Sequence, residues 1–277
     1  MSYKTILVHV DESRRASERI KIAAAIAVTQ KAHLIGTAMT GASRYLIQMH
    51  MLAELDPNLK THLDFLRERA QRGLEDFETA ARMLGLASFE KRLVDDEAGG
   101  GICLQGRFAD LILIGQNDPA EISPIVLPDF PQYVVLHSGR PVLVVPHAGR
   151  FDNIGKHVVI AWDGSMEATR TITSALPLLR CAQVVEILMF NAQPHVHGPE
   201  PGADLALYLE RHGIPAEIVL RQTIENIGKA LLSLAALRGA DLVIMGAYGH
   251  TRFREIVLGE VTRAVLETMT IPVLMSR

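Results

Sequence analysis

The residues best placed to do chemistry in this chain are three glycines near its C-terminus, spaced as Gly246-x2-Gly249-x9-Gly259. Glycine has no side chain, so it lets a backbone approach a ligand closely. The apolar run that ends at Gly246 is typical of a buried strand, and the segment after Gly259 is typical of a helix. Because the N–H groups and the dipole of a helix N-terminus attract anions, this arrangement predicts a phosphate site.

The glycine loop differs from two common nucleotide-binding motifs, the GxxxxGK[ST] sequence of a P-loop and the GxGxxG dinucleotide fingerprint. Two glycines in a loop are most often turn residues, so the prediction depends on what lies nearby. Asp163 ends an apolar run at 156–162. Ligands of open parallel sheets bind beyond the carboxyl ends of the strands, so Asp163 and the glycine loop face one crevice if their strands are neighbours.

The chain contains this pattern twice. Residues 110–115 read DLILIG and residues 241–246 read DLVIMG, an offset of 241 − 110 = 131. The offset holds without a gap to RPVL at 140–143 and IPVL at 271–274. The chain is therefore an internal duplication.

The start of the duplication has a different offset, because Asp163 matches Asp11 and 163 − 11 = 152. The first copy therefore has 152 − 131 = 21 additional residues, which we place at 45–65 and interpret as an added amphipathic helix. We predict two domains, 1–147 and 155–277, with a glycine-containing linker between them.

Strands alternate with helices in both copies, which is typical of a parallel sheet covered on both faces. Ser13 and Ser165 stand just before the first helix of each copy, so we predict both to be helix N-caps. The predicted strands include 4–10, 32–39, 90–94, 110–115 and 142–145 in the first copy, and 156–162, 216–220, 241–246 and 273–275 in the second.

With the glycine spacing, the Asp after the first strand and the closing PVL strand in place, the chain resembles the universal stress protein family, specifically its tandem members. The resemblance covers essentially the whole chain. It implies two tandem doubly wound α/β domains, each a five-stranded parallel sheet of order 3-2-1-4-5 flanked by helices. It also implies ATP or AMP binding in some members, dimerisation through the last strand, and a stress-related role without established enzymatic turnover.

The resemblance implies one set of cofactor-binding residues, all in the second copy. Those that contact adenosine or line the ribose and phosphates are Asp163, Gly246 and Gly249. Those that hold phosphate, through backbone N–H groups and one hydroxyl, are Gly259, Val261 and Thr262. Those that pack beside the ligand are Ala161, Met245 and Tyr248.

The chain departs from the family motif at Glu260, where the motif has Ser or Thr. A carboxylate ~4 Å from a phosphate charge repels it by roughly 4 kcal/mol at an effective dielectric constant of about 20. Mg²⁺, Arg252, Arg254 or Arg263 would offset this repulsion. In the other interpretation, Glu260 points away and favours its own helix dipole. AMP has fewer phosphates than ATP, so we expect it to be tolerated better.

The first copy keeps the spacing of the motif but lacks most of the residues suited to bind phosphate. Its motif positions hold Gly115, Asp118, Pro128, Asp129 and Pro131. Proline has no N–H to donate, and acids repel phosphate. We predict no nucleotide there, and we interpret Asp11 as a cap or a remnant.

Composition narrows the function class. Hydrophobic content of 48% and charged content of 21% indicate a globular protein, and a net charge of −3 gives no indication of nucleic-acid binding. The sequence has no apolar run of about 20 residues that would span a bilayer, and its start lacks a secretory pattern. We expect a cytoplasmic protein that partners neither membranes nor nucleic acids.

The favoured hypothesis is a stress protein that senses or carries an adenine nucleotide in its second copy. A second hypothesis is a chaperone-like interaction protein with both sites degenerate, in which residues 45–65 hold an apolar ligand. A slow ATPase ranks last, because no general base other than Asp163 is positioned. We expect the strands at 142–145 and 273–275 to pair inside the chain, and a homodimer stays open.

Overall fold

The computed structural model describes residues 2–43, 57–121, 123, 125–193, 199–249 and 259–277. The chain divides into two compact units, Ser2–Arg140 and Pro141–Arg277. The finer domain limits expected from the repeat, 1–147 and 155–277, stay a prediction. Within the described ranges, every helix is too short or too polar to cross a membrane.

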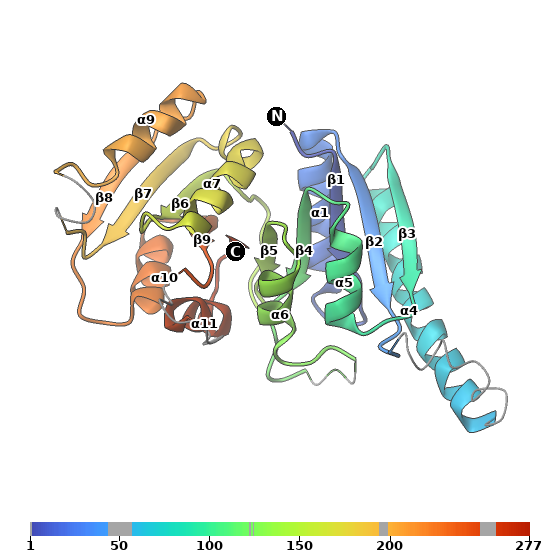
Figure 1. Cartoon of the computed structure of the whole chain (residues 1–277). Helices are drawn as coiled ribbons and strands as arrows, with labels where there is room; N and C mark the ends of the chain where they lie inside the picture. Colours follow the sequence, from blue (N-terminus) through green and yellow to red (C-terminus); the bar gives the residue numbers. More distant parts are fainter. Residues whose placement is uncertain (1, 44–56, 122, 124, 194–198, 250–258) are drawn as a thin grey trace. The chain divides into compact units, whose positions relative to one another are not determined.

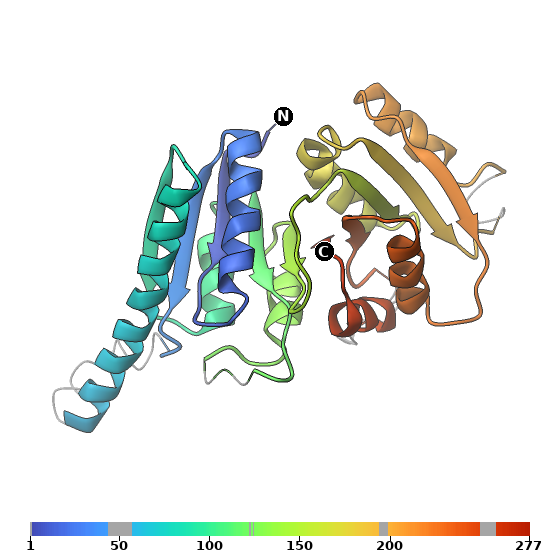
Figure 2. The same cartoon turned by 180° about the vertical axis from the view of Figure 1, so that it is seen from behind.

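The first unit is a parallel sheet with helices on both faces (Figures 1 and 2). Its strands lie in the order β3-β2-β1-β4. The helices α1 and α4 cover one face, and α5 and α6 cover the other. The strands are β1 (Thr5–His9), β2 (His33–Met39), β3 (Phe89–Val94) and β4 (Leu111–Gly115), and the helices are α1 (Ala16–Gln30), α4 (Pro57–Met83), α5 (Ala98–Gly106) and α6 (Phe130–His137).

The second unit has the same strand order as the first and adds a fifth parallel strand of its own. The order of its repeat strands is β8-β7-β6-β9-β10, all parallel, which confirms the predicted order 3-2-1-4-5. The strands are β6 (His157–Ala161), β7 (Val184–Phe190), β8 (Glu217–Arg221), β9 (Leu242–Gly246) and β10 (Val273–Ser276), and the helices are α7 (Met166–Leu179), α9 (Ala203–Arg211), α10 (Ile227–Leu237) and α11 (Glu260–Thr268).

The strand β5 (Val142–Val145) closes the first repeat in sequence but belongs to the second compact unit. It pairs antiparallel with β10, with Leu143 opposite Leu274. The expected pairing of the two closing strands is therefore present. Association of the two domains as wholes, and of two chains into a homodimer, stays a prediction.

Burial explains why the central strands are continuous apolar runs. Leu111 to Ile114 of β4 and Leu242 to Ile244 of β9 are completely buried. A strand covered by helices on both faces cannot alternate apolar and polar residues, because both sides of the pleat lie in the core.

The additional residues of the first repeat were expected at 45–65. Residues 45–56 of that segment lie outside the described residues. Residues 57–65 form the first turns of α4, which has 27 residues against 9 in its counterpart α9. The described part of the insertion therefore lengthens a helix of the fold.

Candidate functional site

The candidate site of the second unit lies where β6 and β9 end side by side. The two strands pair in parallel, with Ala161 opposite Met245. Met245 is buried and Ala161 is half-buried, so two apolar residues lie at the carboxyl ends of these strands. Asp163 follows β6 and Gly246 ends β9, so both come to the same edge of the sheet, as the sequence predicted.

Asp163 is exposed and shapes the turn into α7. Its carboxylate accepts a hydrogen bond from the backbone N–H of Ser165 at 2.9 Å. The Ser165 hydroxyl accepts one from the N–H of Ala168 at 3.2 Å and is the N-cap of α7, as predicted. The entrance of α7 is thus fixed beside the acid.

The first two motif glycines allow the loop after β9 to lie against this helix entrance. A Cβ atom on Gly246 would lie 2.5 Å from the backbone nitrogen of Ala168, which no real contact permits. A Cβ atom on Gly249 would lie 3.1 Å from a Glu167 carboxylate oxygen and 3.2 Å from the Ser165 hydroxyl. Both glycines therefore have a packing role that does not depend on a ligand.

Tyr248, between these glycines, has an unusual backbone conformation, with φ at +67°. A bulky side chain in this left-handed region costs about 1–3 kcal/mol, and such strain clusters at functional sites. Its hydroxyl is buried and finds no hydrogen-bond partner within the ranges that the structure describes. Burial raises the pKa of Tyr248 to about 12, so the hydroxyl keeps its proton at neutral pH.

Thr262 holds the strained loop in place. Its side chain is buried, and its hydroxyl accepts a hydrogen bond from the backbone N–H of Tyr248 at 3.3 Å. Gly259, the N-cap of α11, is close enough that a Cβ atom would lie 3.7 Å from both Thr262 Oγ1 and Tyr248 Cα. The first turn of α11 is therefore joined to the loop after β9.

Glu260 is exposed in that first turn, but its carboxylate has a partner on another helix. It accepts a hydrogen bond from the Asn226 side-chain amide at 2.9 Å. Asn226 is the N-cap of α10, where its carbonyl oxygen accepts the N–H of Lys229 at 3.2 Å. This agrees better with the second interpretation of Glu260, as an acid serving helix N-termini, than with an acid facing a phosphate.

The surroundings of Glu260 limit how its charge is offset. Arg263 forms an ion pair with Glu267 at 2.7 Å, one turn further along α11. Arg252 and Arg254 lie outside the described residues. Val261 is half-buried, and its carbonyl oxygen would lie 2.8 Å from a Cβ atom on Gly228, so α10 and α11 touch at their N-termini.

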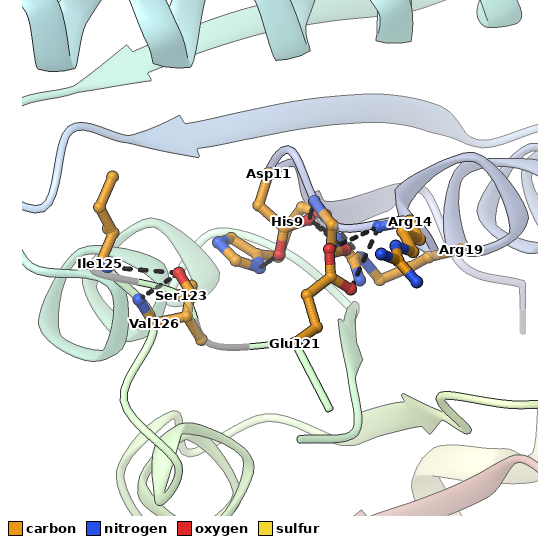
Figure 3. Close-up of polar contacts among 9 residues, drawn as sticks. His9, Asp11, Arg14, Arg19, Glu121, Ser123, Ile125 and Val126 are labelled. Carbon is orange, nitrogen blue, oxygen red and sulfur yellow. Dashed lines mark hydrogen bonds and ion pairs between the residues drawn. The ribbon is translucent and has the colours of Figure 1, made fainter. Parts of the chain in front are cut away.

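The equivalent crevice of the first unit contains a buried cation that sequence reasoning missed. The Arg19 guanidinium is 2% exposed and lies 2.8 Å from the Asp11 carboxylate, and it donates to the His9 carbonyl at 2.8 Å (Figure 3). A Cβ atom on Gly115 would lie only 2.6 Å from Arg19 Nη1, so the guanidinium fills the space beside this glycine. The offset of 152 aligns Arg19 with Thr171, and this Arg-for-Thr difference was the available signal.

This cation sets the electrostatics of the crevice. Burial alone would raise the pKa of Asp11, but Arg19, His9 and the Ser13 hydroxyl outweigh it and hold that pKa well below its usual range. Burial lowers the pKa of His9 to about 4, Asp11 opposes the shift and Arg19 adds to it. Asp11 is therefore a charged partner of Arg19 rather than an idle remnant.

The prediction that Ser13 caps the first helix is wrong. The Ser13 hydroxyl donates to the Asp11 carboxylate at 2.5 Å, and α1 starts later, after Arg15, whose side chain forms no cap. Asp11 competes for the serine because its charge accepts a stronger hydrogen bond than a neutral group does.

The loop after β4 turns toward the same crevice (Figure 3). The Glu121 carboxylate accepts the backbone N–H of Arg14 at 3.1 Å. Ile125 packs on Gly41, where a Cβ atom would lie 2.6 Å from its side chain. The described residues of this loop therefore contact the segment after β1 through Glu121 and the segment after β2 through Ile125.

Comparison with known proteins agrees with this geometry. The model of the universal stress protein family matches the chain twice, at residues 2–146 and 155–277. A universal stress protein of Synechocystis sp. (strain ATCC 27184 / PCC 6803 / Kazusa) is 28% identical over 182 residues, which span 63% of this chain and 60% of that protein.

Solved structures that match nearly the whole chain show the same fold. A universal stress protein from Archaeoglobus fulgidus DSM 4304 has a TM-score of 0.74 at 17% identity, over 99% of this chain and 96% of its own. A second structure from Archaeoglobus fulgidus, in complex with dAMP, matches 52% of this chain and 98% of its own at 18% identity, with a TM-score of 0.36. The chain belongs to the universal stress protein family.

Proposed function

We propose that the C-terminal domain binds an adenine nucleotide, ATP or AMP, and that the protein acts as a sensor or regulatory module in a stress response. The observation that carries the proposal is the strained Tyr248, held by Thr262 between the end of β9 and the start of α11. Strain of this kind persists where the surrounding structure fixes a conformation that function requires.

The residues of this crevice fit such a ligand. The N-cap Gly259 has no side chain to occupy the N–H groups of α11, and among the described residues no side chain caps this helix. These N–H groups and that of Val261 would hold a phosphate, with the helix dipole favouring its charge. Asp163 would accept hydrogen bonds from the adenosine moiety, and Ala161 and Met245 would pack against it.

Mg²⁺ is part of the proposal for ATP. When bound, it would neutralise part of the phosphate charge near Glu260. The Thr262 hydroxyl accepts a hydrogen bond from the backbone N–H of Tyr248, so the hydroxyl proton of Thr262 could be donated to a phosphate oxygen. Tyr248 would cover the ligand with its half-buried ring. Binding would then change the surface that a protein partner meets.

We further propose that the N-terminal domain binds no nucleotide. Arg19 already pairs with Asp11 there, and Glu121 accepts the backbone N–H of Arg14. A nucleotide would have to displace a buried ion pair, which is strongly unfavourable.

Calorimetric titration of the full chain with ATP and with AMP, in Mg²⁺ buffer, tests the proposal. The key variant is Gly259→Asp, because among the described residues a Cβ atom there meets nothing closer than 3.7 Å, and aspartate is a good N-cap. We expect Gly259→Asp to reduce affinity more than tenfold through charge repulsion, and the neutral isostere Gly259→Asn to lose less. Equal binding by wild type and Gly259→Asp, or binding by neither, overturns the proposal.

A further inference from the structure

We infer that Asn226 is a specificity-determining residue of the nucleotide site, because it holds the Glu260 carboxylate on the N-terminus of α10 and thereby lets phosphate approach α11. The inference rests on the proposed function, and it answers how an acid is accommodated in the first turn of a phosphate-binding helix. The geometry that points to it is the 2.9 Å hydrogen bond from Asn226 Nδ2 to Glu260 Oε1.

Asn226 is fixed by its own place in the fold. It is the N-cap of α10, and its Oδ1 accepts the N–H of Lys229 at 3.2 Å. An Asn amide has one acceptor and one donor end, so with Oδ1 committed to the cap the donor end faces outward. The donor end is the one that binds Glu260. One side chain therefore caps one helix and holds an acid of the next.

The two helices are close enough for this contact to be specific. A Cβ atom on Gly228 would lie 2.8 Å from the Val261 carbonyl oxygen and 3.1 Å from Ala264, so only glycine permits this approach of α10 to α11. Figure 1 shows α10 and α11 side by side. Bringing Glu260 to the N-terminus of α10 also adds a second helix dipole to the one that already favours its charge.

The consequence concerns phosphate. A carboxylate bound to Asn226 occupies one fixed position, whereas a released carboxylate samples the space in front of α11 and repels an anion there. Arg263 cannot replace Asn226 without breaking its pair with Glu267. Because the repulsion grows with ligand charge, releasing Glu260 should weaken ATP binding more than AMP binding.

The test is a double-mutant cycle with Asn226→Ser and Glu260→Gln in the full chain, titrated with ATP and AMP. Serine keeps an N-cap hydroxyl for α10 but is too short to replace the amide donor. We expect Asn226→Ser to weaken ATP binding about twofold to fivefold, the range of exposed charge interactions, and AMP binding less. In the Glu260→Gln background, Asn226→Ser should change neither affinity.

The outcomes separate this inference from the function it rests on. If wild type binds and Asn226→Ser binds equally well, the inference is overturned and nucleotide binding stands. If Asn226→Ser weakens binding equally with Gln at 260, the effect is structural and the inference is again overturned. If neither wild type nor Glu260→Gln binds any nucleotide, the proposed function fails and the inference fails with it. Thermal unfolding of each variant confirms that it is folded.

Discussion

The two crevices of this chain have an aspartate and a serine at the same positions, but the aspartates have different partners and different exposure. Each has an aspartate after its first strand and a serine two residues later. In the first unit the aspartate pairs with the buried Arg19, and in the second the exposed Asp163 shapes the turn into a capped helix. One crevice has an internal cation, and the other leaves its acid at the surface.

The difference shows how one fold holds two different arrangements of charge at the same place. At this aligned position the second unit has Thr171 and the first has Arg19, whose guanidinium supplies the positive charge that pairs with Asp11. Thr171 uses its hydroxyl only for backbone carbonyls, of Glu167 at 2.7 Å and Ser276 at 3.3 Å. An uncharged residue that hydrogen-bonds the backbone in one unit thus corresponds to the central charge of the other.

The largest expected effect comes from making the first crevice like the second. Arg19→Thr leaves Asp11 without its charge partner in a largely buried setting, and we expect it to destabilise the N-terminal unit by about 3–5 kcal/mol. Hydrogen exchange of peptides from residues 2–43 measures the loss. Arg82→Met is the control, because it removes an exposed i,i+4 ion pair with Glu78 and a contact with the Phe89 ring, and should cost far less than Arg19→Thr. Similar losses in both variants would contradict the central role of Arg19.

The second effect is a pH dependence confined to the first unit. His9 has its pKa lowered to about 4, so between about pH 6.5 and pH 4 the unfolded chain binds a proton that the folded chain does not. Stability contributed by neutral His9 is therefore lost as pH falls through this window, by about 3 kcal/mol in all.

The His9 prediction is checked with His9→Leu, which removes the titrating group and keeps an apolar side chain against Phe130. The free energy of unfolding should fall between pH 6.5 and pH 4 in wild type and stay flatter in the variant. Asp11 does not confuse the result. Its pKa lies well below the usual range, so its contribution is lost only at still lower pH. Parallel pH profiles in the two proteins would show that His9 does not titrate as its burial requires.

Sequence reasoning succeeded where a pattern is local or repeated. The continuous apolar runs of β4 and β9 predicted strands buried on both faces. The cap at Ser165 follows from a serine directly before a helix. Each of these depends on periodicity or on residues a few positions apart.

Sequence reasoning failed where a side chain has two alternative hydrogen-bond partners, or where two side chains distant in sequence meet in the fold. Ser13 has the same local sequence signal as Ser165, but the charge on Asp11, fixed by Arg19, draws its hydroxyl away. The contact of Asn226 with Glu260 joins residues 34 positions apart. Tyr248 was unexpected because left-handed backbone is ordinarily the place of glycine.

The third effect compares the glycine that ends β9 with its counterpart at the end of β4. A Cβ atom on Gly246 would meet backbone atoms of Glu167 and Ala168, whereas one on Gly115 would meet the tip of the Arg19 side chain. Backbone cannot move as a side chain can, so we expect Gly246→Ala to cost about 2 kcal/mol and Gly115→Ala to cost less. Urea unfolding of both variants gives the order, and the reverse order would refute this account of the two loops.

The smallest effect tests the two serines directly. Ser165→Ala removes the N-cap of α7 and should cost about 1 kcal/mol, with faster hydrogen exchange at the N–H of Ala168. Ser13→Ala should leave exchange in the first turn of α1 unchanged, because that helix starts after Arg15 and, in the described structure, its first N–H groups donate no hydrogen bond to Ser13 Oγ. Its cost instead falls on Asp11, which loses one of the hydrogen bonds that hold its pKa low. Faster exchange at the start of α1 in Ser13→Ala would mean that both serines are caps in solution, and the contrast between the two crevices would then rest on Arg19 alone.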